Sequence, residues 1–254
     1  MAYLNKQVKP TIPGDVQNTQ FNNNDILFDW TAFDLPRGSA LLKTVAAIIR
    51  GEDGVASTAQ QHIHLFFARS VDGVAPESLG TVNSTANGTG FFNKIIGGVV
   101  LDKVDAIIDG IDAIHIYQLG HSGTSTQGLP EIAFSTEDFS TATYSSSERY
   151  YVAAIHHGGL GFNFTTGVLL NQGSNQATAT GSTTLTVDGT DARKVFSVGD
   201  VMIDTSNAVI GTVTAVASAT SVTVDAVANE ITDDDELLVQ SPVGLQLSFE
   251  LGKF

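Results

Sequence analysis

The chain has 254 residues, of which 42% are hydrophobic and only 15% charged, a length that suits one or two domains with a substantial core. Its net charge of −15 excludes a nucleic-acid binder and a protein that docks on an anionic membrane, because no Lys/Arg cluster could neutralise phosphates. The absence of cysteine excludes disulfides and Cys-based metal or redox sites, so the chain can fold in a reducing cytoplasm.

The first segment, residues 1–24, is polar, rich in Asn and Gln, and slightly positive, with two lysines against one acid. One interpretation is a disordered tail, which is common at chain ends. The other is an extended N-terminal arm that orders against a neighbouring subunit, because its apolar side chains give it something to bury. On that interpretation the partner-binding residues are Tyr3, Leu4, Lys6, Val8, Lys9 and Ile12.

From residue 25 onward the pattern is typical of β-strands separated by turns. Runs of apolar or alternating residues predict strands over 26–30, 41–49, 60–68 and 150–155. Pro36 and Gly38 mark a turn after the first of these strands. Residues 71–90 have the composition of a loop, and residues 162–170 are expected to resume strand pairing.

Residues 91–120 fit more than one periodicity. Val100, Val104, Ile107, Ile108 and Ile111 recur at helical spacing, which predicts a short helix. A strand over 113–119 is expected to follow that helix.

Residues 181–240 read as a small unit of their own, preceded by a linker-like stretch over 171–181. Short strands bounded by turn residues are predicted over 184–187, 201–203, 210–216, 221–224 and 237–239. Strands of this length and spacing favour a small five-stranded antiparallel barrel. The unit carries −8 of the chain's charge, which suits a solvent-facing module.

The chain ends in a regular alternation, with Leu245, Leu247, Phe249 and Leu251 separated by polar residues. This pattern predicts a half-buried strand, which needs a sheet to join. Because the barrel before it is already complete, the strand is expected to return to the first domain. The predicted fold is therefore mainly β, with an arm (1–24), a β-sandwich or jelly-roll-like body (25–180 plus 241–254) and a projecting inserted barrel (181–240).

The candidate metal ligands are His62, His64, Asp233 and Asp235. His62 and His64 share a face of a predicted strand, as in a cupin-like site, but no Glu follows within residues 65–72. The acidic run at 233–236 lacks the spaced ligands of a Ca²⁺ loop and is expected to be a solvated turn. We therefore expect histidines hydrogen-bonded at a sheet surface or subunit contact, and no metal.

The sequence contains no pattern that supplies an activated nucleophile or a phosphate-binding loop. We therefore expect no catalytic residues, no cofactor and no enzymatic activity. The competing hypothesis is a cupin-like metalloenzyme, which would need His62, His64 and His115 to converge with a carboxylate.

A family resemblance rests on the stretch from Phe196 to Asp225, which contains V-G-D-V and I-G-T-V-T-A-V, followed by D-D-D-E-L-L-V at 233–239. It resembles a β-barrel module that recurs in structural proteins of tailed phages, marine and cyanobacterial phages especially. Residues 33–54 and 62–81 resemble structural proteins of the same phages. The resemblance covers about a quarter of the chain through the module and implies no catalytic residues.

What the resemblance implies is a capsid decoration (cement or knob) protein on the virion surface, folded in the host cytoplasm. Its partners would be the major capsid protein and other copies of itself, with the barrel facing outward. The alternative is a tail, neck or fibre protein that binds a host glycan or another tail protein. A glycan platform would need exposed aromatic residues in the module, where Phe196 is the single aromatic.

Overall fold

The computed structural model describes residues 2–50, 62–71, 73–86, 90–102, 106–107, 114–120, 130–135, 147–158, 163–164, 168–170, 180–232 and 235–252. The protein is mainly β, with antiparallel sheets and two short helices, α1 (Gly14–Gln17) and α2 (Ala192–Val195). A 3₁₀ turn, η2 (Phe92–Lys94), comes directly before the strand that starts at Ile95. No helix in the described part of the chain is long and apolar enough to cross a membrane.

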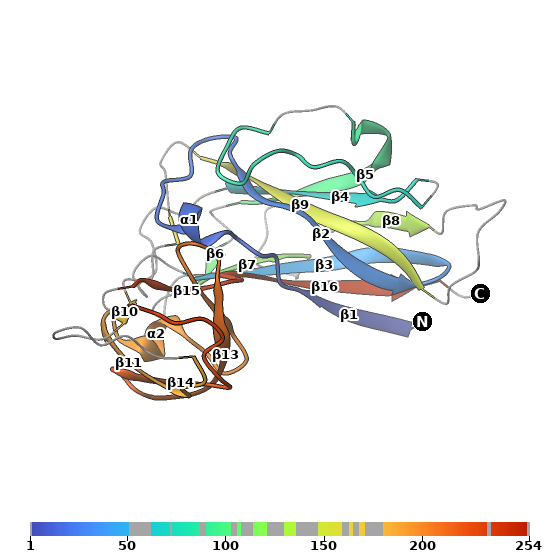
Figure 1. Ribbon diagram of the computed structural model, residues 1–254. Coiled ribbons are helices and arrows are strands. Elements are labelled where there is room, and N and C mark those ends of the chain that lie inside the picture. The colour runs from blue at the N-terminus through green and yellow to red at the C-terminus, as the bar shows by residue number, and fades with distance from the viewer. Residues whose placement is uncertain are drawn as a thin grey trace.

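Two sheets form the body of the molecule (Figure 1). The larger runs in the order β1 (Ala2–Val8), β16 (Val243–Leu251), β3 (Ser39–Arg50), β7 (Ile114–Leu119), β6 (Ala106–Ile107), with β8 (Ile132–Ser135) paired to the start of β3. The smaller runs in the order β2 (Ile26–Pro36), β9 (Ser147–His157), β4 (His62–Arg69), β5 (Ile95–Leu101).

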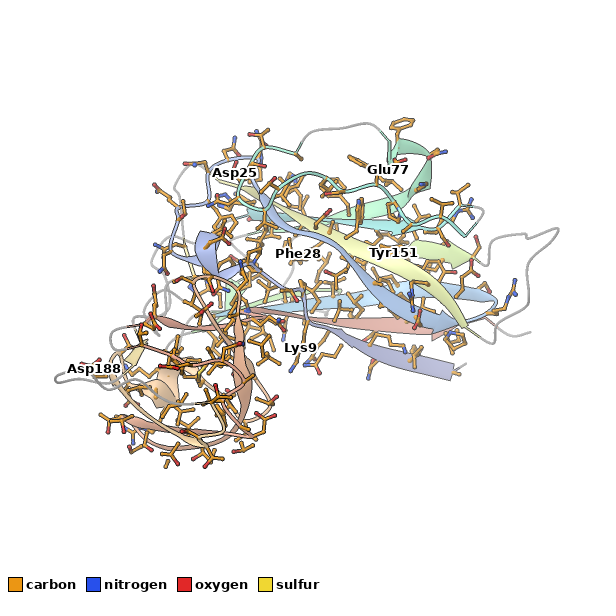
Figure 2. The ribbon with its side chains drawn as sticks, viewed as in Figure 1. Lys9, Asp25, Phe28, Glu77, Tyr151 and Asp188 are labelled. Carbon is orange, nitrogen blue, oxygen red and sulfur yellow. The ribbon has the colours of Figure 1, made fainter. Side chains whose placement is uncertain are left out.

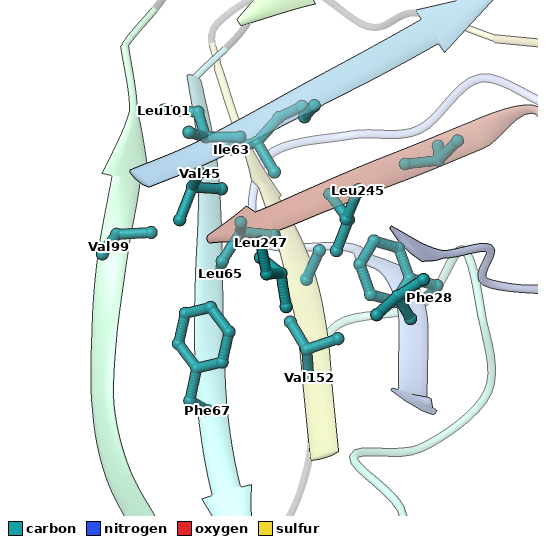
Figure 3. Packing of buried hydrophobic residues seen from close by; sticks show 14 of the residues in the cluster. Phe28, Val45, Ile63, Leu65, Phe67, Val99, Leu101, Val152, Leu245 and Leu247 are labelled. Atoms are coloured by element: carbon teal, nitrogen blue, oxygen red, sulfur yellow. The ribbon is translucent and has the colours of Figure 1, made fainter. Parts of the chain in front are cut away.

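The two body sheets pack face to face around one hydrophobic core. Alternate residues of each strand point inward, so Val45 on β3 and Leu247 on β16 meet Leu65 on β4 and Val152 on β9 (Figure 3). Aromatic rings fill much of the space, and Phe134 lies within 5.1 Å of Tyr150 and 5.2 Å of Phe249, measured between ring centroids. Large rings are suited to bridging the roughly 10 Å gap between two packed sheets.

The third sheet belongs to residues 168–239, and we call residues 181–240 the acidic module. Its order is β10 (Val168–Leu170), β11 (Thr184–Gly189), β14 (Ser221–Val224), β13 (Val209–Ser218), β12 (Val201–Asp204), β15 (Leu237–Val239). Its core is separate from that of the body and consists of Val, Leu, Ile, Ala and Met side chains with Phe196. Register shifts where β13 pairs with β12 and with β14 curl the sheet around this core.

The five strands predicted for the acidic module are confirmed, but a barrel is not. The sheet also contains β10, and its outer strands β10 and β15 are not joined in the strand pairing of the described residues. None of the sheets is closed into a barrel, and a jelly-roll arrangement of the body is not confirmed either.

The predicted final strand is confirmed as β16, and it returns to the body between β1 and β3. The strands predicted over 41–49, 60–68 and 150–155 correspond to β3, β4 and β9, and the one over 113–119 to β7. A strand does form within 162–170, as β10, but it pairs with β11 of the acidic module and not with a strand of the body, to which residues 25–180 were assigned. Period-two alternation identified these strands because one of their faces is buried.

The short helix predicted around Val100–Ile111 is wrong for the described residues of that segment. Val100 lies in strand β5, one residue before its end, and Ile107 lies in the two-residue strand β6 paired with β7. Val99 and Leu101 point into the core at strand spacing, because pairing with β4 decides the local structure over helical propensity. Val104, Ile108 and Ile111 lie outside the described residues.

Candidate functional site

The histidines predicted as metal ligands lie on the outer face of the smaller sheet. His62 and His157 are directly opposite each other on β4 and β9, and the His64 and His157 rings stack at 4.7 Å between centroids. His62 Nδ1 lies 3.3 Å from Asp102 Oδ1, and His157 Nδ1 lies 3.3 Å from Asn24 Oδ1. The cluster is therefore an imidazole stack with a carboxylate close to His62 and a side-chain amide hydrogen-bonded to His157.

Burial governs the protonation of two histidines at this edge of the sheet. Burial lowers the pKa of His64, and the nearby His157 and His62 lower it further. Burial also lowers the pKa of His156, against the opposing effects of the Asn22 carbonyl, which lies 2.8 Å from Nδ1, and of Asp25. Both imidazoles are held neutral near pH 7, which is the form that hydrogen-bonds without charge.

The structure does not bring together the set that a cupin-like centre requires. His62 and His64 face outward from β4, whereas His115 on β7 is buried on the core side of the other sheet. Among the described residues, no three His, Asp or Glu side chains are placed to hold one metal ion.

The acidic run at 233–236 was expected to be a solvated turn, and the structure describes its last two residues, Asp235 and Glu236, both of which are half-buried. Asp235 Oδ2 accepts a hydrogen bond from the Thr232 backbone N–H at 2.6 Å. Asp233 lies outside the described residues. Phe196, the module's one aromatic residue, is 3% exposed, so it offers no surface on which a sugar could stack.

The residues predicted to bind a partner fall into two groups. Val8 and Ile12 are buried in the core of this chain, and Leu4 packs against that core. Tyr3 is 67% exposed and Lys9 is exposed, while Lys6 is half-buried (Figure 2 shows Lys9 where β1 approaches the acidic module). Residues 2–8 are ordered as an edge strand of the body's own sheet, an arrangement that neither sequence interpretation contained.

Residues 12–18 join the body to the acidic module through hydrogen bonds. The Ile12 backbone N–H donates to the Gln240 carbonyl at 2.9 Å, and the buried Gln17 Nε2 donates to the Val239 carbonyl at 3.0 Å. The Gly14 N–H donates to Asn207 Oδ1 at 2.5 Å. This joint had no local signal in the sequence, because its partners lie about 200 residues away.

Arg50, at the end of β3, makes the second part of the joint. Its guanidinium lies 2.7 Å from the Asp200 carboxylate and also donates to the Val195 carbonyl. Asp200 is 9% exposed and accepts a further hydrogen bond from the Ser197 N–H. A charge-assisted pair in a partly buried setting holds two elements in a defined geometry, so the module has a fixed orientation on the body.

The body ends in a shallow hollow on the side away from the module. Its volume is about 290 Å³, and it is lined by the start of β3, by β8 and by the end of β16, with Leu41, Phe134 and Leu251 among its residues. Glu250 is one of the lining residues, and its partner on the neighbouring strand β1 is Tyr3, whose side chain is exposed. Sequence reasoning missed this hollow because three distant segments form it.

No protein family matches this chain, and no curated protein matches it either.

Proposed function

We propose that this chain is a structural protein of a tailed-phage particle, a capsid decoration protein that attaches to the outer shell and presents its acidic module to solvent. The proposal starts from the resemblance carried by residues 196–225 and 233–239. It assigns no catalytic activity and no cofactor to the chain.

The observation that carries the proposal is the placement of two unlike regions at opposite ends of the molecule. The acidic module lies at one end of the body, and the start of β1 and the end of β16 lie at the other (Figure 1). The module carries −8, while the first residues of β1, Ala2 to Asn5, contain no charged side chain. A molecule with this polarity can dock through its N-terminal end and keep its charged end in water.

The joint between module and body supports the same proposal. A decoration protein stabilises a shell by adding interface, which requires a body that does not deform under load. Gln17 and Arg50 fix the module to the body by hydrogen bonds on two sides. The module would then project in one orientation from every copy.

The experiment that tests the proposal is binding of the full chain to purified shells that lack it. We expect saturable binding at a stoichiometry comparable to the shell subunit, with a gain in the shell's resistance to heat. Deletion of residues 1–24 would be a poor control, because it removes Val8, Ile12 and Phe21 from the core.

The matched controls are purified tails and host cells, incubated with the same labelled chain. Signal on tails or cells, with none on shells, would overturn the decoration proposal in favour of a tail-associated protein. Binding to none of the three would leave the chain without a virion partner and overturn both.

A further inference from the structure

Strand β1 forms an open edge of the larger body sheet. All seven residues from Ala2 to Val8 pair with β16 in one continuous antiparallel register, without a bulge. On its other side β1 is paired with no strand in the described part of the chain. Every second N–H and C=O of an antiparallel edge strand points away from its neighbour, so β1 presents a row of free hydrogen-bonding groups.

The edge strand β2 of the other body sheet has bulges, a proline and loop cover, three features that β1 lacks among the described residues. The register of β2 against β9 shifts twice, between Ile26 and Phe28 and again before Thr31, and the strand ends at Pro36. Its first residues are covered by a loop, since the Ile26 N–H donates to the Ser84 carbonyl at 2.9 Å. Bulges, proline and loop cover are the devices by which proteins block strand addition. A seven-residue regular edge lacking them is suited to accept a strand.

The positive charge of Lys6 determines which kind of strand can pair with the free edge of β1. Lys6 is the one charged residue on β1, and Lys9 follows the strand directly. A lysine on an edge disfavours cationic and self-complementary strands, and it favours a strand with a carboxylate opposite it. The rest of this chain is strongly acidic, so the edge is a local cationic site on a protein of charge −15.

A second copy of this chain fits the edge poorly. Antiparallel pairing of two β1 strands would place the two acidic modules at opposite ends of the dimer, so that both could not face outward from one shell. Parallel pairing would place Lys6 beside Lys6 and one module of charge −8 beside another.

We propose that the β1 edge accepts an extended, carboxylate-bearing strand from the shell subunit, which would add to the larger body sheet next to β1. The inference rests on the proposed function for the identity of the partner. Backbone hydrogen bonds along the edge would supply the contact, and Lys6 would select the register.

Hydrogen exchange of the full chain, free and bound to shells that lack it, tests this inference directly. We expect the outward amides within residues 2–8 to exchange rapidly in the free chain and to become protected on the shell. The inward amides of the same strand, already bonded to β16, serve as the internal reference.

A charge reversal gives the second readout. Lys6→Glu should weaken shell binding roughly tenfold or more, because it places like charges opposite each other across the interface. Lys194→Glu makes the same change at an exposed site on the acidic module and should leave binding within about twofold. Thermal unfolding of both variants checks that each one remains folded.

The outcomes separate the two proposals. Shell binding without protection of β1 would overturn the edge inference and leave the decoration function intact. Failure of the wild-type chain to bind shells would overturn both. Protection of β1 that grows with concentration in the free chain would show that a second copy occupies the edge, and would overturn the inference in that way.

Discussion

The body and the acidic module fill their hydrophobic cores with different kinds of side chain. The body core contains seven buried phenylalanines and two tyrosines, whereas the module core has one aromatic residue, Phe196, among aliphatic side chains. Two facing sheets leave a wide gap that rings can bridge, while one curled sheet encloses a narrow space that Val, Ile and Leu fill. A unit of about 60 residues buries too small a fraction of its surface to be very stable alone, so its joint to the body matters.

The largest effect is expected from removing a ring of the body core. Phe134→Ala should lower the free energy of unfolding by about 3–5 kcal/mol, because it deletes contacts with Tyr150 and Phe249 and leaves a cavity. Leu185→Ala is the matched change in the module, at about 2–5 kcal/mol. In urea unfolding, the two losses of unfolding free energy should add in the double variant, because Phe134 and Leu185 belong to separate hydrophobic clusters with no residue in common. Strong non-additivity would contradict the description of two separate cores.

The next largest loss of unfolding free energy is expected at the joint between the body and the acidic module. Arg50→Ala should cost about 1.5–3 kcal/mol, because it removes a hydrogen-bonded charge partner from Asp200. Calorimetry should then resolve separate transitions for module and body where the wild type shows one. Arg149→Ala breaks an exposed pair with Asp34 and should cost less than about 1 kcal/mol, with the single transition retained. Identical behaviour of the two variants would show that Arg50 does not join the two regions.

A smaller effect is expected from crowding the other side of the joint. A Cβ at Gly14 would collide with the backbone carbonyl oxygen of Asp204, so Gly14→Ala should cost about 1–3 kcal/mol and loosen the module. The control is Gly244→Ala on β16, where an added Cβ meets nothing within 4 Å. Limited proteolysis should cut the module of Gly14→Ala faster than that of Gly244→Ala. Equal rates would exclude close packing at Gly14.

The smallest expected effect is a pH dependence of the unfolding free energy, which arises from two histidines of the body. His64 and His156 have a pKa below the usual 6.5 in the folded state, so the unfolded chain takes up protons first as the pH falls. Their contribution to stability is therefore complete above pH 6.5 and is lost progressively below it. Urea midpoints from pH 8 to pH 5 should fall, and His64→Gln should flatten the decline. An unchanged slope in that variant would assign the effect to other groups.

Much of the strand content could be predicted from local pattern alone. The alternation from Leu245 to Leu251 identified β16, and turn chemistry around Val198–Asp200 and Ser218–Thr220 delimited the strands of the acidic module. These signals are local, because a strand with one buried face must alternate whatever its partner is. The separate, acidic character of residues 181–240 was equally visible in the composition.

The candidate sites could not be predicted from the sequence, because they depend on the tertiary structure. The stack of His64 on His157 depends on the register of β4 against β9, and the open edge of β1 depends on its pairing with β16 at the far end of the chain. The sequence by itself determined that this protein is mainly β, acidic, and composed of a body and a smaller module. Only the tertiary structure decided that β5 is a strand, that Gln17 and Arg50 hold the module, and that β1 is an edge, because pairing between distant segments sets all three.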